Sequence, residues 1–102
     1  MIEFNGKQYV LRYSQQRIEM IESTTNAPIL ANLAKNNNML SLSDLKTYFA
    51  YGLKENGEDI FVPIKKALEV AQQLVESLGY AGLLQAVLEA LERDCPFLCQ
   101  TP

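Results

Sequence analysis

The sequence predicts an α+β fold, with an N-terminal two-stranded antiparallel β-hairpin packed against a bundle of about four to five helices. Three observations support this class. Apolar and polar residues alternate through residues 1–13, the period of amphipathic helices recurs in residues 14–95, and the 102-residue length suits one domain. Hydrophobic residues make up 48% of the chain and charged residues 21%, which is typical of a globular protein. We therefore expect residues 1–102 to form a single domain, with an irregular loop at 23–40 and a C-terminal tail at 96–102.

The hairpin is predicted from the dipeptide Asn5-Gly6, because both central residues of a type I′ turn need a positive φ. With a two-residue turn, Ile2 pairs with Tyr9 and Phe4 pairs with Lys7. One face of the hairpin then carries the apolar side chains Ile2, Phe4, Tyr9, Leu11 and Tyr13. An isolated hairpin is marginally stable in water, so helices are expected to cover this face.

Two helices are predicted on either side of the irregular loop. Ser14 is a suitable N-cap for a short helix that runs to about Glu22. Ser41 or Ser43 begins a longer helix that runs to about Lys54. The inward stripe expected on this longer helix is Leu42, Leu45, Phe49, Gly52 and Leu53, flanked by Tyr48 and Tyr51. Within the loop, helical spacing favours a short helix that includes Ile29, Leu30, Leu33 and Ala34.

The last part of the chain is predicted to form two helices joined by a tight corner. Pro63 suits the first turn of a helix that continues to residue 78, and Gly79 ends it. Its apolar stripe is expected to comprise Ile64, Ala67, Leu68, Ala71, Leu74, Val75 and Leu78. A final helix follows over residues 80–94, and only the corner at Gly79 separates the two.

No catalytic, cofactor or metal site is expected. The chain has no histidine, and its paired carboxylates fall on predicted polar faces or in turns, where they are solvated. A zinc site needs about four nitrogen or sulfur ligands, whereas the chain offers two cysteines, Cys95 and Cys99. The sequence therefore predicts a protein that is not an enzyme.

Nucleic acid and membrane partners are also disfavoured. The net charge is −3 and no stripe of basic residues appears, although nucleic-acid-binding domains usually carry one. No signal peptide is recognisable, and no apolar run approaches the ~18 residues of a membrane helix. We expect a cytoplasmic protein with reduced thiols.

After these exclusions, the remaining function is binding to another protein through apolar surface. Most apolar residues of a small domain serve its core, so candidates for partner binding are those outside the helical stripes. The candidate partner-binding residues are Met20, Met39, Leu40, Tyr51, Phe97 and Leu98. A groove between helices would suit an amphipathic helix of another protein.

The order of these elements resembles that of the small tail assembly chaperones of long-tailed phages, which are related to a tail component of gene transfer agents. Residues 2–14 read Ile-Glu-Phe-Asn-Gly-Lys-Gln-Tyr-Val-Leu-Arg-Tyr-Ser, which is similar to the two strands and the Gly-Lys turn of that family. An Ile-Glu element follows within residues 17–22, and a leucine-rich helix ends in the Gly-Leu element Gly52-Leu53. The two helices over residues 63–78 and 80–94 complete the pattern.

The resemblance implies a non-catalytic chaperone in the cytoplasm of the host cell. Such a protein binds the long, helical tape measure protein of the phage tail while tube subunits polymerise around it. The implied partners are the tape measure protein and, beyond it, the tail tube protein, with self-association left open. The family also implies a longer form made by translational frameshifting, of which this chain would be the short form.

Two other functions remain open at this stage. One is a structural tail completion or connector component of the virion, which would stay in the finished particle. The other is a small DNA-binding regulator that uses the helical corner at Gly79. The helix after that corner has no basic residue before Arg93, which is unfavourable for phosphate contacts.

Overall fold

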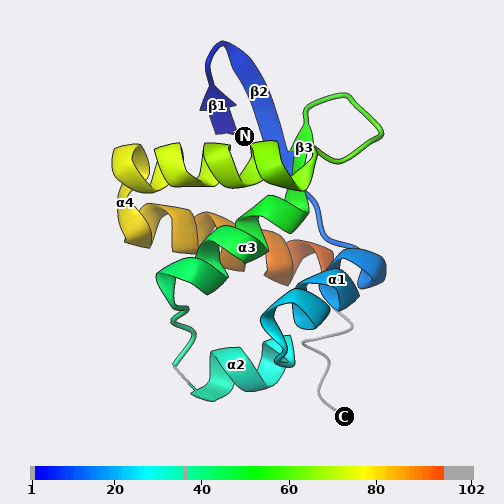
Figure 1. Cartoon of the computed structure of the whole chain (residues 1–102), viewed down its shortest axis with the longest axis vertical. Coiled ribbons are helices and arrows are strands. Elements are labelled where there is room, and N and C mark those ends of the chain that lie inside the picture. Colours follow the sequence, from blue (N-terminus) through cyan, green and yellow to red (C-terminus); the bar gives the residue numbers. More distant parts are fainter. Residues whose placement is uncertain (1, 36, 96–102) are drawn as a thin grey trace.

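The computed structural model describes residues 2–35 and 37–95 and confirms the α+β class (Figure 1). Within these residues, a three-stranded antiparallel sheet of order β1-β2-β3 is combined with four helices. The elements are β1 (Ile2–Phe4), β2 (Lys7–Leu11), α1 (Gln15–Thr25), α2 (Ile29–Lys35), α3 (Leu42–Gly52), β3 (Leu53–Glu55) and α4 (Ile64–Asp94).

Strands β1 and β2 form the hairpin in the register that the sequence predicts. Ile2 pairs with Tyr9, and Phe4 pairs with Lys7. Asn5 and Gly6 have φ values of 52° and 77°, so both central positions of the turn take the left-handed conformation that only a few residue types tolerate. The turn chemistry therefore sets the register of the hairpin.

The sheet has a third strand, which the two-stranded prediction missed. Helix α3 ends at Gly52, earlier than the expected Lys54, and Leu53 continues in an extended conformation as the start of β3. Leu53 pairs with Leu11, and the Gly52 carbonyl accepts a hydrogen bond from the Arg12 amide at 2.8 Å. Leu53 fits the apolar stripe of α3 equally well, so helical spacing alone could not detect this change of conformation.

The stretch at 23–40 is more regular than expected. Helix α1 continues to Thr25, beyond the predicted end at Glu22, and stops where Asn26 adopts a φ of 57°. Helix α2 occupies the position of the predicted short helix, and its first amide, that of Ile29, donates to the Glu22 carboxylate at 2.9 Å. This contact ties the start of α2 to α1.

Helix α4 is broken at Gly79, as the sequence predicts. Gly79 has φ 79° and ψ 164°, and the chain turns back there so that residues 64–78 and residues 80–94 run as two arms (Figure 1). We call these the first arm and the second arm. By length and composition α4 also meets the criteria for a membrane-spanning helix, which apolar core helices of soluble proteins satisfy as well. Here the two arms place apolar side chains in the core.

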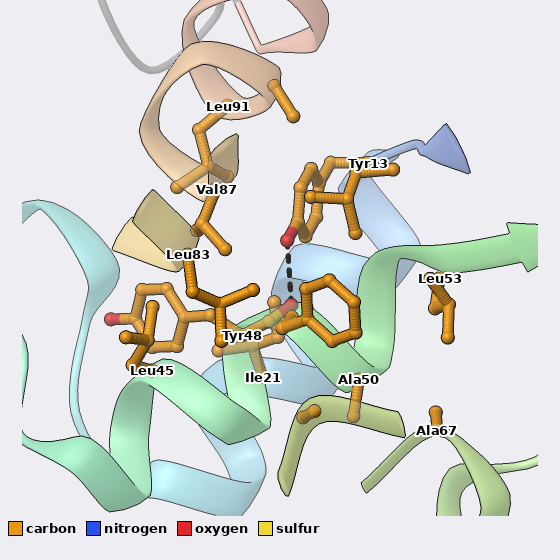
Figure 2. Close-up of a cluster of buried hydrophobic side chains, with 14 of the residues drawn as sticks. Tyr13, Ile21, Leu45, Tyr48, Ala50, Leu53, Ala67, Leu83, Val87 and Leu91 are labelled. Atoms are coloured by element: carbon orange, nitrogen blue, oxygen red, sulfur yellow. Dashed lines mark hydrogen bonds between the residues drawn. The ribbon is translucent and has the colours of Figure 1, made fainter. Parts of the chain in front are cut away.

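The core lies between α3, the second arm and the end of β2 (Figure 2). Tyr48 is fully buried, although the sequence placed it at the flank of the α3 stripe. Tyr13 donates its hydroxyl hydrogen to the Tyr48 carbonyl at 2.7 Å, and burial raises the pKa of Tyr13. Gly52 is necessary beside this ring, because a Cβ there would lie 2.5 Å from Tyr13 Cζ. The Tyr13 ring therefore occupies space that only glycine at position 52 leaves free.

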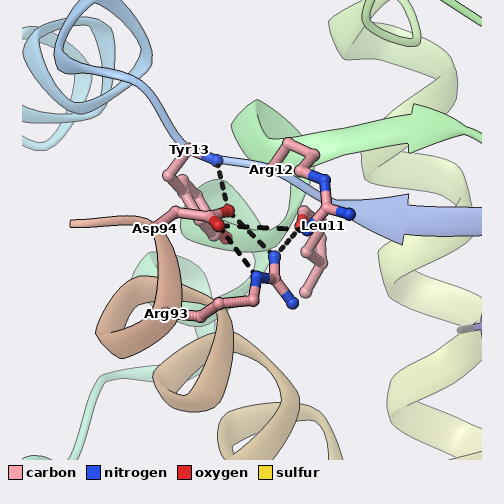
Figure 3. Close-up of polar contacts among 5 residues, drawn as sticks. All are labelled: Leu11, Arg12, Tyr13, Arg93 and Asp94. Carbon is pink, nitrogen blue, oxygen red and sulfur yellow. Dashed lines mark hydrogen bonds and ion pairs between the residues drawn. The ribbon is translucent and has the colours of Figure 1, made fainter.

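Polar contacts join the end of the second arm to the end of β2 (Figure 3). The Asp94 carboxylate accepts hydrogen bonds from the Tyr13 amide at 3.0 Å and from Arg93 Nε at 2.8 Å. Arg93 Nη2 also donates to the Leu11 carbonyl, and Arg12 Nη1 lies 3.9 Å from Asp94. The hydrogen bond from Arg93 is the main reason why the pKa of Asp94 is lowered. The contacts of Asp94 with Tyr13 and of Arg93 with Leu11 join residues that are separated by 81 and 82 positions in the sequence.

Candidate protein-binding surfaces

The part of the chain that the structure describes contains no group of three or more His, Cys, Asp or Glu side chains placed to hold a metal ion. Cys95 is buried, and Cys99 lies outside the described residues. Tyr13, Tyr48 and Asp94 have shifted pKa values, and each is engaged in contacts that hold the fold together. The surfaces of interest are therefore the apolar ones.

The candidate partner-binding residues do not form one surface. Met20 and Tyr51 lie together, at a shallow groove of about 340 Å³ between α1 and the end of α3. Met39 lies elsewhere, just before α3, and is 49% exposed. The remaining two surface candidates, Phe97 and Leu98, lie outside the described residues.

Tyr51 is held by polar contacts and is only partly exposed. Its hydroxyl lies 2.9 Å from Thr24 Oγ1, and its carbonyl accepts a hydrogen bond from Arg17 Nε at 2.6 Å. The Arg17 guanidinium also lies over the rings of Tyr51 and Phe61, with 4.0 Å to the Phe61 centroid. Burial lowers the pKa of Arg17. The cation–π cluster beside the groove of Met20 therefore connects α1, α3 and the chain after β3, and it contributes to the fold.

Leu40 was predicted to be a surface residue, and this prediction is wrong. Its side chain is buried, and its backbone is fixed by the Tyr80 hydroxyl. That hydroxyl donates to the Leu40 carbonyl at 2.5 Å and accepts from the Leu40 amide at 3.0 Å. The paired hydrogen bonds hold the segment before α3 against the start of the second arm, which turns the Leu40 side chain inward.

Exposed leucines lie on α3 and on the first arm of α4, which contact each other through Lys46 and Gln72. The two run antiparallel, because Lys46 Nζ donates to Gln72 Oε1 at 2.5 Å while Leu40 meets Tyr80. Leu42 lies one turn before Lys46 in α3, and Leu68 lies one turn before Gln72 in the first arm. We define the seam surface as Met39, Leu42, Leu68 and Leu78, which are 37–51% exposed.

The sequence missed most of the seam surface because periodicity gives the direction of a side chain and not its depth. Leu42, Leu68 and Leu78 all fit the inward stripes, yet Leu42 is the first residue of α3 and Leu78 is the last before the break at Gly79. At the end of a helix, the next turn is missing, so it cannot cover the last apolar side chain. Proximity to the N-cap Ser41 and to Gly79 was the available signal.

A second apolar feature lies between the sheet and the start of α4. A cavity of about 180 Å³ is lined by the apolar or aromatic residues Tyr9, Phe61, Val62 and Pro63. Ile60 lines its mouth and is 76% exposed. Its rim carries the charged residues Lys7, Glu55, Glu58 and Lys66. We call this feature the Ile60 pocket.

Among the described residues, the seam surface and the Ile60 pocket are two apolar features that lie at the surface. Comparisons of this chain with protein-family models, with curated proteins and with solved structures found no match.

Proposed function

We propose that this protein is a non-catalytic tail assembly chaperone that binds the tape measure protein of a long-tailed phage in the host cytoplasm. The observation that carries the proposal is the seam surface, four large apolar side chains that stay half-exposed beside a well-packed core. Exposed apolar side chains gathered on one surface favour protein binding. The resemblance of residues 2–14 and of the later helices to that chaperone family adds the identity of the client.

The geometry of the seam surface suits a helical client. Leu68 and Leu78 are separated by ten residues of helix, which corresponds to about 15 Å along the axis. An amphipathic helix of about three turns covers that length with apolar residues at positions i, i+3 or i+4, and i+7. Lys46 and Gln72 lie between the apolar ends of the seam and offer polar partners to the same helix.

Modest affinity follows from the same geometry. The seam side chains are already about half covered in the free protein, so a client helix removes only part of their surface from water. A chaperone that must release its client during tail assembly needs such limited affinity.

The test is co-expression with a tape measure protein of a long-tailed phage. The wild-type protein is expected to keep the client soluble and to co-purify with it. Leu42→Asp and Leu68→Asp are expected to lose both effects, because each places a charge in the apolar seam. Leu30→Asp is the matched control, since Leu30 is 51% exposed but lies on α2.

Two results would overturn the proposal. One is a wild-type protein that neither binds the client nor keeps it soluble, with circular dichroism confirming that it is folded. The other is a Leu30→Asp variant that fails as completely as the seam variants. Mass spectrometry of finished particles tests the alternative of a structural tail component, because a chaperone leaves the particle and a connector stays.

A further inference from the structure

Ile60 projects from a segment whose backbone is fixed directly after it. Phe61 forms a bridge with Lys54, and the Val62 amide donates to the Leu53 carbonyl at 2.9 Å. The Phe61 ring is covered by the Arg17 guanidinium at 4.0 Å. Ile60 is therefore held in place, and among the described residues it is the most exposed large apolar side chain.

The cavity beside Ile60 is apolar and has room for one aliphatic side chain. Tyr9, Phe61, Val62 and Pro63 line it, and Tyr9 and Val62 belong to the core. Two of the lining residues are thus fixed in the core, and a side chain that enters displaces water from an apolar site. A projecting aliphatic residue and a matching cavity lie next to each other on the same surface.

Charged side chains of both signs, Lys7, Glu55, Glu58 and Lys66, line the cavity. Glu55, Glu58 and Asp59 lie in and beside the turn after β3, and Lys7 meets Glu55 at 3.9 Å. Helix α4 begins after Pro63 without a side-chain cap, and its first turn contains Lys65 and Lys66 but no acidic residue. This helix start combines positive side chains with the positive end of the helix dipole.

A surface with these properties is self-complementary. In a two-fold symmetric contact, residue i of one copy meets residue j of the other, and j of the first meets i of the second. We propose that two copies of this chain associate through the Ile60 pocket. Ile60 of each copy enters the cavity of the other, and the Glu58 turn of each copy faces Lys66 and the uncapped start of α4 in the other.

This dimer is separate from the proposed chaperone function. The residues of the Ile60 pocket and of the seam surface do not overlap, so a client helix and a second copy can bind at once. A contact centred on one side chain and its pocket belongs to the small, weak class of interfaces. The dimer is therefore expected to form at micromolar or higher protein concentration, which corresponds to a Kd on the order of 10–100 μM.

Sedimentation velocity of the full chain, from about 5 μM to 1 mM, tests the proposal over the range in which a weak dimer forms. The wild-type protein is expected to shift from monomer to dimer across this range. Ile60→Asp is expected to raise the Kd at least about tenfold, because it buries a charge in the apolar pocket. Leu30→Asp adds the same charge at another exposed leucine and is expected to dimerise like the wild type.

Charge exchange identifies the two-fold arrangement. Lys66→Glu and Glu58→Lys are each expected to weaken self-association, because each brings like charges together twice in a symmetric dimer. An equimolar mixture of the two variants is expected to dimerise again, since the mixed pair restores opposite charges at both contacts. The double variant is expected to recover dimerisation by itself.

Three outcomes would overturn the proposal. The first is a wild-type protein that stays monomeric at about 1 mM. The second is an Ile60→Asp variant that dimerises like the wild type, and the third is a mixture of charge variants that stays monomeric. Ile60→Ala serves as a second pocket variant and introduces no charge. Seam variants such as Leu42→Asp are expected to keep the dimer, so loss of client binding and loss of dimerisation are distinguishable.

Discussion

The two arms of α4 use apolar residues in different ways. The second arm buries large side chains, among them Leu83, Val87 and Leu91, against Tyr13 and Tyr48 (Figure 2). The first arm buries mainly smaller ones and leaves Leu68 and Leu78 exposed. One continuous apolar pattern in the sequence thus divides into an arm that builds the core and an arm that also presents surface.

The ends of the two arms show the same contrast. The second arm ends in the contacts of Arg93 and Asp94 with β2, which satisfy charges of both signs (Figure 3). The first arm begins with no side-chain cap and two lysines. Unfavourable charge at a helix start costs stability. We infer that the residues of the second arm are suited to stabilising the fold, whereas those of the first arm are suited less to stability than to contacts at the surface.

The strongest test of this contrast is one leucine truncation in each arm. Leu83→Ala is expected to lower the free energy of unfolding by about 3 kcal/mol, because the side chain is fully buried and its removal leaves a cavity. Leu68→Ala is expected to cost less than about 1 kcal/mol, since that side chain is 37% exposed. Urea denaturation with unchanged m-values measures both. Equal losses would contradict the assignment of different roles to the arms.

The junction between the arms gives the next largest effect. Gly79→Ala is expected to cost about 2 kcal/mol, because φ 79° with ψ 164° is a conformation that essentially only glycine adopts. A Cβ there would meet no atom within 4 Å, so the cost is one of backbone conformation. Gly82→Ala is the control within regular helix. Alanine there is expected to leave stability unchanged or raise it by up to about 1 kcal/mol.

Thermal unfolding of the two glycine variants measures this difference. A destabilised Gly82→Ala would point to the Leu78 Cβ, which would lie 3.4 Å from the new methyl group. A Gly79→Ala protein as stable as the wild type would show that the reversal of the chain does not need this backbone conformation.

The smallest effect concerns the end of the second arm. Asp94→Asn is expected to cost about 1 kcal/mol at pH 7, because it removes the charge from the hydrogen bonds with Arg93 and Tyr13. The pKa of Asp94 is lowered in the folded protein, so its contribution is complete above the unfolded pKa of about 4. The contribution is lost as the pH falls through the lowered folded value.

The difference in stability between wild type and Asp94→Asn should therefore be constant from pH 5 to 7 and shrink below about pH 4. Urea titrations at pH 7 and at pH 3 measure it. Glu92→Gln removes the same charge at an exposed neighbouring position and is the matched control. A pH-independent loss of stability in Asp94→Asn would show that the Asp94 side chain contributes through its packing and not through its charge.

Local signals in the sequence predicted local structure well. Asn5-Gly6 determined the hairpin register, Ser14 and Ser41 cap α1 and α3, and Gly79 separates the two arms. Each of these depends on residues within one turn of the chain. The third strand was missed because its formation depends on Leu11, 42 residues before Leu53.

The candidate surfaces were harder to predict for the same reason. Leu40 looked exposed by its place in an irregular stretch, but it is covered through Tyr80, 40 residues later. Leu42 and Leu78 looked buried by their spacing, but they lie at helix ends beyond the cover of neighbouring elements. Ile60 belongs to a short apolar run of which only Val62 is buried. Depth below the surface is a property of the assembled fold.

The contacts of Arg93 and Asp94 with Leu11 and Tyr13 have a consequence for synthesis on the ribosome. The hairpin is made first, but the residues that close its end against the core are the last of α4 to be made. Until they emerge, the apolar face of the hairpin and the inner face of α3 remain uncovered in the nascent chain. The nascent chain would thus pass through an aggregation-prone stage that ends only when residue 94 leaves the ribosome.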